Sequence, residues 1–392
     1  MAAKGRKNTH KIPDGLPRAD GGVRGWTPPS FYAFSFPFVA TPPPIVSRLA
    51  DFHAALHGWY RVHQRRLPWR EAPSVYKTVV SEFMLQQTQV VTVLPYFDRW
   101  LREFPDFAAL AAAPEAKVMK LWEGLGYYSR ARNLLKLAQA YVTAVPPPRR
   151  PAEWRELPGI GPYTAAAITS ISFDEPAAVV DGNVVRILAR LTGESRQFRD
   201  GTEAVKHFTP LADALIVGGL PGEHNQAMME LGATVCLRQK PMCLTCPVAA
   251  FCVMRQAGDP ERVPRFKPKE IEQRAVARIW CVDRDRLLLR RGHAQAKRLA
   301  GLHELPEASD VGLERDQAQL LATKRRTITR FQIAESIYAA RPDSTLKQRV
   351  REDAALEWVP LAKLDDITLS GPHRRWVREL QARTTSGQGS PS

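Results

Sequence analysis

Apolar residues recur at helical spacing throughout residues 45–255 of the chain. Val75, Val79, Phe83 and Met84, for example, fall on one face of a helix. Proline-rich breaks separate this stretch from others with the same period. The pattern therefore predicts an all-α domain over residues 45–255.

The pattern changes beyond residues 256–270, a polar segment that we interpret as a linker. Two short β-type runs, Val276–Val282 and Leu287–Leu289, flank a polar turn, and Phe331–Ala339 is a further candidate strand. These runs predict a separate α+β domain over residues 271–383.

The ends of the chain, residues 1–44 and 384–392, show no hydrophobic period, and we interpret them as a disordered leader and tail. The chain has 56 Lys and Arg against 40 Asp and Glu, a formal charge of +16. Such an excess favours a polyanionic partner, nucleic acid before a membrane. No apolar run approaches the ~20 residues of a membrane span. We expect a monomer with no membrane segment.

Four of the five cysteines lie within 17 residues at the spacing C-x6-C-x2-C-x5-C: Cys236, Cys243, Cys246 and Cys252. Four thiolates this close can enclose one metal centre. A zinc site of four cysteines usually has two C-x2-C pairs, and this stretch has one. The spacing resembles the [4Fe-4S] loop of the endonuclease III superfamily of glycosylases, which implies an iron–sulfur cluster. The fifth cysteine, Cys281, falls in a predicted strand and is expected to be a buried thiol.

A short glycine-containing segment, Leu157–Gly161, joins two helical stretches. Gly159 and Gly161 allow a tight turn whose backbone N–H groups suit a DNA phosphate at a helix N-terminus. A plain helix–helix turn explains the same residues. Asp181 follows in the run Val180–Val184, where it is a candidate functional carboxylate or a helix N-cap, and the two roles are compatible.

Glu82 is the second candidate carboxyl, within the run Ser81–Thr88. On a helix it adjoins Val75, Val79 and Leu85, so apolar groups surround its carboxyl. Desolvation raises the pKa of a carboxyl and lets it hold a proton near neutral pH. A glutamate beside an apolar stripe is also typical of an ordinary surface residue, but that does not explain the Gln-Gln pair that follows.

Together these segments resemble the MutY-type adenine DNA glycosylases, within the endonuclease III or helix-hairpin-helix superfamily. The resemblance spans about Ser47 to Val377 and is dense in the first domain. It implies that Glu82 protonates adenine and that Asp181, with Asn183 near it, stabilises the positive charge that develops on the sugar. It also implies a set of residues that contact the substrate: Trp69, Arg70, Leu85, Gln87, Tyr127, Gln226 and Met229.

Within that set the resemblance implies different roles. Trp69 would stack on adenine and Gln226 would bond its edge. Gln87 would wedge into the duplex where the base is flipped out, and Tyr127 would intercalate beside the oxidised guanine.

Position 163 separates this interpretation from its nearest rival. Superfamily members that also cut the DNA backbone have a lysine two residues after the last hairpin glycine, and its amine forms a Schiff base. Here Tyr163 stands two residues after Gly161, and a phenol cannot form an imine. We therefore expect a monofunctional glycosylase, with a bifunctional endonuclease III-like glycosylase and lyase as the alternative.

In the second domain, Leu287–Arg291 and Gly301–Pro306 resemble the Nudix-like domain of the same family. A Nudix hydrolase needs clustered carboxylates to hold magnesium, and the chain contains no Glu-Glu pair. We therefore interpret this domain as a binding module. The alternative, a nucleotide pyrophosphohydrolase, is disfavoured by the missing carboxylates. Thr329 and Arg330 stand where the family has Ser and His in a loop that checks for 8-oxoguanine. The hydroxyl can keep its hydrogen bond, and the guanidinium can contact a purine edge or a phosphate.

The expected architecture is a helix-hairpin-helix glycosylase domain with two lobes and the site in the cleft, followed by a Nudix-like domain. The expected partner is double-stranded DNA that contains adenine opposite 8-oxoguanine or guanine. The expected location is the cytoplasm of a prokaryote, at the nucleoid. A non-catalytic iron–sulfur DNA-binding protein is a further alternative, which the presence of both Glu82 and Asp181 disfavours.

Overall fold

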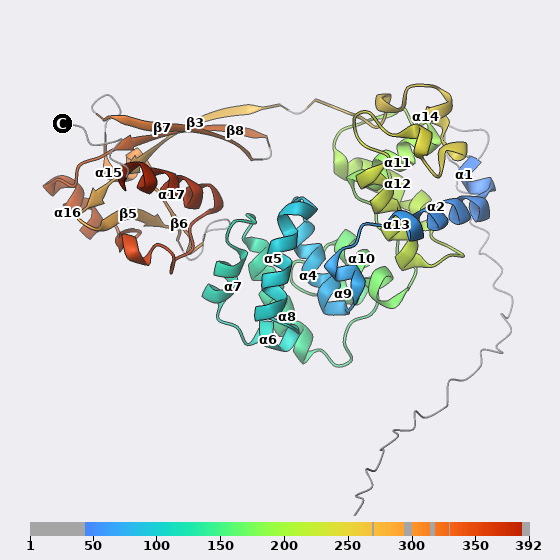
Figure 1. Cartoon of the computed structure of the whole chain (residues 1–392), viewed down its shortest axis with the longest axis horizontal. Coiled ribbons are helices and arrows are strands. Elements are labelled where there is room, and N and C mark those ends of the chain that lie inside the picture. The colour runs from blue at the N-terminus through green and yellow to red at the C-terminus, as the bar shows by residue number, and fades with distance from the viewer. Residues whose placement is uncertain (1–43, 269, 294–299, 314–317, 329, 386–392) are drawn as a thin grey trace, which may run out of the picture. The chain divides into compact units, whose positions relative to one another are not determined.

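The computed structural model describes residues 44–268, 270–293, 300–313, 318–328 and 330–385 (Figure 1). The predicted leader except Pro44 and most of the predicted tail lie outside these residues, as does Thr329. Helices fill the region predicted to be all-α: α1 Pro44–Ser47, α2 Leu49–His63, α3 Pro68–Glu71, α4 Val75–Leu85, α5 Val90–Glu103, α6 Phe107–Ala111, α7 Glu115–Trp122, α8 Ser129–Thr143, α9 Pro151–Arg155, α10 Pro162–Phe173, α11 Gly182–Thr192, α12 Gly201–Leu215, α13 Pro221–Thr234 and α14 Val253–Gln256.

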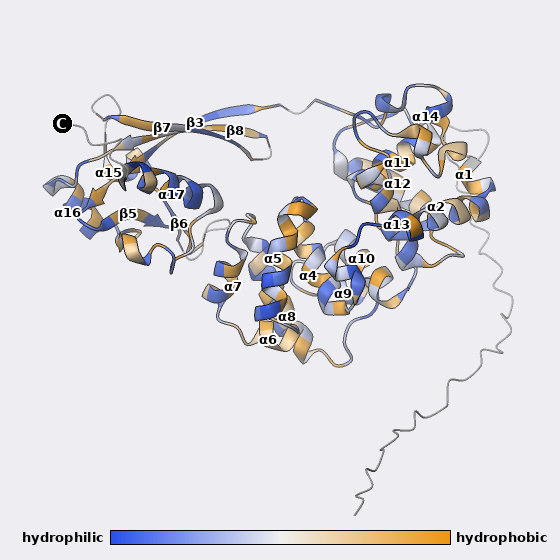
Figure 2. Ribbon diagram, viewed as in Figure 1, coloured by the Kyte–Doolittle hydropathy of each residue, from blue (hydrophilic) through white to orange (hydrophobic). Residues whose placement is uncertain are grey.

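Local sequence explains where the helices of the site begin. The Ser74 side chain caps α4 by accepting a hydrogen bond from the Lys77 backbone N–H (3.2 Å). Pro162 occupies the first turn of α10, where a missing N–H costs nothing. Figure 2 shows apolar and polar residues mixed along longer helices such as α2 and α5, as amphipathic helices require.

The helical region has two separate large apolar cores. The first is built on α4–α8 and α10 and buries large side chains such as Phe83, Trp100 and Trp122. The second joins the start of the described chain, including Phe52 on α2, to the helices from α11 to α14, including Phe208. The expected two-lobed arrangement is therefore present, and the first two helices complete the second lobe.

The predicted linker, residues 256–270, is partly wrong because its middle packs on the helical region. After the 3-10 turn η4 (Pro260–Arg262), Val263 is buried in the second core. Strand β2 (Arg265–Phe266) then pairs in parallel with β1 (Gln197–Phe198). The polar composition of this segment predicts a flexible chain. Burial of the Val263 side chain and the main-chain hydrogen bonds between β2 and β1 instead hold it against the helical region.

The later region combines strands with three helices among the described residues, as the predicted α+β class requires. Its elements are β3 Glu272–Trp280, β4 Val282–Asp283, β5 Arg286–Arg291, β6 His303–Glu304, α15 Ala308–Val311, β7 Leu320–Ile328, β8 Phe331–Ala339, α16 Ser344–Glu352, β9 Leu356–Pro360 and α17 Gly371–Thr385. Strand β8 pairs in parallel with β3 and in antiparallel fashion with β7. Strand β5 pairs antiparallel with β4, β6 and β9. Cys281 is buried in this region, as predicted.

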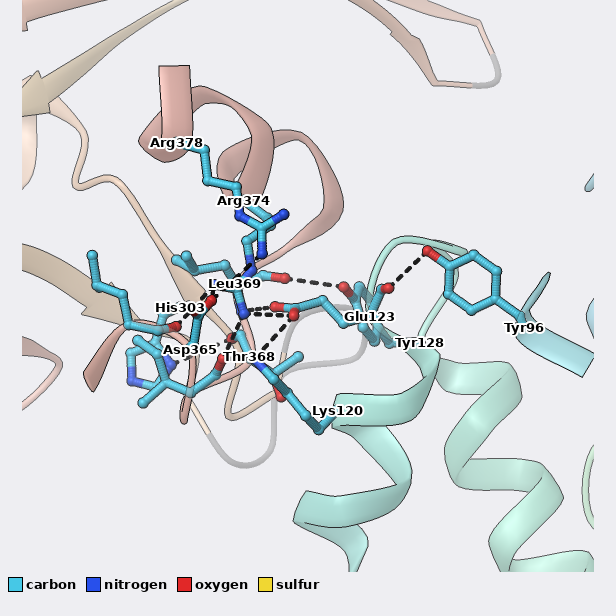
Figure 3. Close-up of polar contacts among 12 residues, drawn as sticks. Tyr96, Lys120, Glu123, Tyr128, His303, Asp365, Thr368, Leu369, Arg374 and Arg378 are labelled. Carbon is cyan, nitrogen blue, oxygen red and sulfur yellow. Dashed lines mark hydrogen bonds and ion pairs between the residues drawn. The ribbon is translucent and has the colours of Figure 1, made fainter. Parts of the chain in front are cut away.

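Polar contacts connect the α7–α8 turn to the segment that precedes α17 and to α17 itself (Figure 3). The Glu123 carboxylate accepts hydrogen bonds from the Leu369 backbone N–H (2.7 Å) and from the Arg374 guanidinium (2.6 Å). The Tyr128 hydroxyl donates to the Leu369 carbonyl oxygen (3.0 Å). Within the described ranges, no helix has both the length and the apolar character needed to cross a membrane.

Candidate active site

A pocket of about 740 Å³ is lined by residues from both lobes of the helical region. It brings together most of the residues that the sequence predicts for catalysis and base binding: Trp69, Arg70, Glu82, Leu85, Tyr163, Asp181, Asn183, Gln226 and Met229. These residues come from α3, α4, α10, α11 and α13 and from the segment before α11, so the site depends on how the helices pack.

Glu82 lies on α4 with only 7% of its surface exposed. Burial raises the pKa of this carboxyl to about 7, and the nearby charge of Asp181 adds to the effect. Hydrogen bonding with Tyr163 and the charge of Arg70 act in the opposite direction and lower the pKa of Glu82 by less. Glu82 can therefore hold a proton near neutral pH, as its apolar helical neighbours predict.

Asp181 is the N-cap of α11, so the structural role considered for it is confirmed. One carboxylate oxygen accepts hydrogen bonds from the backbone N–H groups of Asn183 (2.9 Å) and Val184 (2.8 Å). The other accepts from the Asn183 side-chain amide (3.0 Å), whose oxygen accepts in turn from Arg186 (2.9 Å). Burial raises the pKa of Asp181, and these donors oppose the rise. The carboxylate is thus held rigidly at the pocket wall.

Glu230 is a third pocket carboxyl that the sequence reasoning missed, although it directly follows Met229. It is fully buried, and Arg65 and Arg70 donate to its two oxygens at 2.6 and 3.0 Å. Burial alone would raise the pKa of Glu230, but the hydrogen bonds from Arg65 and the charge of Arg70 outweigh burial and lower it. Glu230 therefore stays ionised and paired, and it is Glu82 that has the environment of a proton donor.

Arg70 and Gln226 line the pocket with some of their polar atoms already engaged. The Arg70 guanidinium donates a hydrogen bond to Glu230. The predicted contact of Arg70 with substrate would therefore use a guanidinium that already binds Glu230. The side-chain oxygen of Gln226 accepts from the Tyr60 hydroxyl (3.2 Å). Trp69 packs edge-on against Phe97 with ring centroids 5.1 Å apart. The pocket wall is therefore built before any substrate enters.

Gln87 and Tyr127 do not line the pocket. Both are exposed, Tyr127 by 48%, on the turns that follow α4 and precede α8. Each has a positive φ, 56° for Gln87 and 47° for Tyr127, which is uncommon for residues other than glycine. Both side chains are therefore accessible, and their predicted contacts with a DNA duplex stay a prediction.

The turn Leu157–Gly161 between α9 and α10 requires one of its two glycines. Gly159 has φ +81°, and a Cβ atom at this position would lie 2.6 Å from the Asn133 Cβ. Gly161 has an extended backbone and is the N-cap of α10. The tight turn is confirmed, and its contact with a phosphate stays a prediction.

The four clustered cysteines line one small apolar cavity together with Arg190. The Arg190 guanidinium lies 3.2 Å from the Cys236 sulfur. Burial raises the pKa of Cys246 to about 12 and also raises that of Cys252. In the described part of the chain, no group of three or more His, Cys, Asp or Glu side chains has the geometry of a site for a single metal ion. The four thiols nonetheless converge, and soft sulfur donors beside a cation fit an iron–sulfur cluster.

Arg330 is exposed where β8 begins. Its guanidinium lies 3.6 Å from the Glu272 carboxylate and stacks 5.1 Å from the centre of the Phe331 ring. Its predicted partner in lesion recognition, Thr329, lies outside the described residues.

Part of the helical region matches a family model, and about half of the chain is similar to curated proteins. Residues 80–209 match the HhH-GPD superfamily base excision DNA repair protein model. The adenine DNA glycosylase of Mus musculus is 44% identical over 218 residues, which cover 53% of this chain and 42% of the mouse protein. That of Buchnera aphidicola subsp. Baizongia pistaciae is 36% identical over 208 residues, covering 51% of this chain and 57% of that protein. The chain thus spans about half the length of these curated relatives.

Among solved structures, a thermostable thymine-DNA glycosylase superimposes with a TM-score of 0.47 and 25% identity, over 54% of this chain and 98% of that one. The matched family segment, 80–209, contains Glu82, the turn at Gly159 and Asp181. Residues 80–209 are therefore similar to the HhH-GPD superfamily of base excision DNA repair proteins, and about half of the chain is similar to adenine DNA glycosylases.

Proposed function

We propose that this protein is a monofunctional adenine DNA glycosylase that acts on double-stranded DNA with adenine opposite 8-oxoguanine or guanine. The observation that carries the proposal is the pair of carboxyls in one pocket, Glu82 buried with a pKa near 7 and Asp181 fixed by three hydrogen bonds. The adenine glycosylases among the relatives support the choice of base.

The reaction follows from these two environments. Protonated Glu82 donates its proton to the flipped adenine, which then leaves with the electron pair of the C1′–N9 bond. Positive charge develops on the deoxyribose, and the Asp181 carboxylate stabilises it in a site shielded from water. A water molecule adds to C1′, and its proton returns to Glu82. Tyr163 adjoins Glu82 and offers no amine to attack the sugar.

The experiment that tests this proposal compares base release from three duplexes, with and without alkali. They contain adenine opposite 8-oxoguanine, adenine opposite guanine, or an oxidised pyrimidine. We expect adenine to be released from the first two and strands to break only after alkali, because Tyr163 cannot form an imine. Borohydride trapping of a covalent complex, or cutting of the oxidised pyrimidine strand, would instead favour the bifunctional lyase.

We further propose that Cys236, Cys243, Cys246 and Cys252 hold one [4Fe-4S] cluster. When bound, the cluster would cross-link the loop and take no part in breaking the glycosidic bond. The positively charged Arg190 beside Cys236 would offset the negative charge of the thiolate ligands.

The cluster predicts the metal content of the purified protein. Anaerobically purified protein should be brown and contain iron, and Cys243→Ala should lose both colour and iron. Cys281→Ala is the matched control and should keep them, because Cys281 lies in the core of the other region. Zinc in place of iron in the unmutated protein would overturn the assignment.

For the later region we propose a Nudix-like fold that recognises the lesion through Thr329 and Arg330. Thr329→Ala should reduce the preference for 8-oxoguanine over guanine by the ~1–3 kcal/mol of one good base contact. Arg330→Ala should weaken binding to both duplexes and reduce its salt dependence, since Arg330 is exposed and charged. Binding of both duplexes at two salt concentrations measures these effects. If neither variant alters preference or salt response, the lesion is read elsewhere.

A further inference from the structure

Arg130 is a buried arginine on the first turn of α8 whose described hydrogen bonds all end on neutral oxygens. Burial lowers the pKa of its guanidinium to about 10, so the group stays charged at neutral pH. A buried charge is costly unless its hydrogen bonds are satisfied. Its Nε is buried without a hydrogen-bond partner among the described residues, and the oxygens that accept from its two terminal nitrogens come from two separate turns of the chain.

The first turn is the end of α4, the helix that carries Glu82. One terminal nitrogen of Arg130, Nη1, donates to the carbonyl oxygens of Phe83 (2.9 Å), Met84 (2.9 Å) and Gln86 (2.5 Å). The last carbonyls of a helix lack partners within the helix, and a cation there also complements the helix dipole. Arg130 thus caps the C-terminus of α4, directly before Gln87.

The second turn precedes α8. The other terminal nitrogen, Nη2, donates to the carbonyl oxygens of Leu125 (3.1 Å) and Gly126 (3.1 Å), and also to the Thr88 hydroxyl (3.2 Å). Tyr127 comes directly after Gly126, and its ring centre lies 5.5 Å from the guanidinium. Arg130 therefore bonds the residues on both sides of Gln87 and the residue just before Tyr127.

Gln87 and Tyr127 are the exposed residues with positive φ described above. Such a backbone persists in a residue other than glycine only where its surroundings determine it. On its other side the second turn is held by the Tyr128 hydroxyl, which bonds the Leu369 carbonyl (Figure 3). The guanidinium is the group shared by both turns.

We propose that Arg130 is a positioning residue that locks the Gln87 and Tyr127 turns together, so that both side chains enter the duplex as one rigid unit. This inference rests on the proposed function, because it assumes a DNA duplex with a base to extrude. A planar guanidinium with two separate donor nitrogens can bond both turns at once, whereas a lysine ammonium is a single point of charge. Arg130→Lys should therefore keep the charge and lose the coupling.

The test follows base unstacking by fluorescence, which needs no catalysis. Every variant carries Glu82→Gln, and the duplex has 2-aminopurine next to adenine paired with 8-oxoguanine. We expect Gln87→Ala and Tyr127→Ala each to reduce the fluorescence increase on binding. Arg130→Lys should reduce it to the level of the Gln87→Ala, Tyr127→Ala double variant, with a much smaller change in Kd for the duplex. Lys136→Met, which removes an exposed charge from the same helix, should match the parent.

The milder variant Thr88→Val removes one of the Arg130 bonds and should give a partial reduction, so it decides the matter if Arg130→Lys does not fold. The proposal is overturned if folded Arg130→Lys unstacks the base like the parent, or if neither Gln87→Ala nor Tyr127→Ala has an effect. Adenine release by the unmutated protein is measured separately. Its absence would reject the proposed function without altering the unstacking result.

Discussion

Replacement of Glu82 by glutamine should slow adenine release by ~10²–10⁴-fold while the protein still binds the duplex. The amide has nearly the same shape as the buried carboxylic acid but cannot deliver a proton to the base. Single-turnover release from adenine opposite 8-oxoguanine, together with the Kd for the same duplex, measures the two effects. Glu71→Gln, an exposed glutamate on α3, is the matched control and should behave like the unmutated protein.

The pH dependence of the same reaction has a defined sign. Burial raises the pKa of Glu82 to about 7, and in the proposed mechanism the protonated form is the active one. The single-turnover rate should therefore be highest below pH 7 and fall as the pH rises through about 7. Glu82→Gln should lack this decline. A near-normal rate in the variant, or an unchanged pH profile, would show that another group protonates the base.

Replacement of Asp181 by asparagine should reduce the rate by ~10²–10³-fold, the usual effect of removing one electrostatic stabiliser of a transition state. The substitution removes the negative charge that faces the developing sugar cation. It leaves α11 capped, because asparagine is as good an N-cap as aspartate. The loss should therefore appear in single-turnover rates with little change in the melting temperature.

The structure offers a close control for this variant. Asp200 caps α12 in the same manner, accepting from the Glu203 backbone N–H (2.9 Å), and it does not line the pocket. Asp200→Asn should leave both rate and melting temperature nearly unchanged. If Asp181→Asn were as active as Asp200→Asn, Asp181 would be only a helix cap.

Segments with a strong local pattern could be predicted from the sequence. The apolar period around Val79 and Phe83 predicted α4, and the run Phe331–Ala339 matches β8 at both ends. The environment of Glu82 was also predictable, because its helical neighbours three and four residues away belong to the same segment. Asp181 could be recognised as a helix cap from its short local sequence, and the family resemblance implied its role as a functional carboxylate.

Contacts between distant segments could not be predicted in this way. Glu230 is neutralised by Arg65 and Arg70, which are about 160 residues earlier in the chain. The prediction of the linker was partly wrong for the same reason. Val263 is buried against helices that are distant in the sequence, and a local pattern cannot show where those helices lie. The parallel pairing of β3 with β8 likewise joins strands that lie far apart in the sequence.

The sequence by itself determined the chemistry available to this protein: two acidic groups, a tyrosine where a lyase would have lysine, and four clustered thiols. These depend on residue type and short spacing, which local rules describe. Only the tertiary structure decided that Glu230 is ion-paired by Arg65 and Arg70 and what Arg130 binds. Both depend on desolvation and on hydrogen-bond partners from remote segments, and burial is a property of the packed chain.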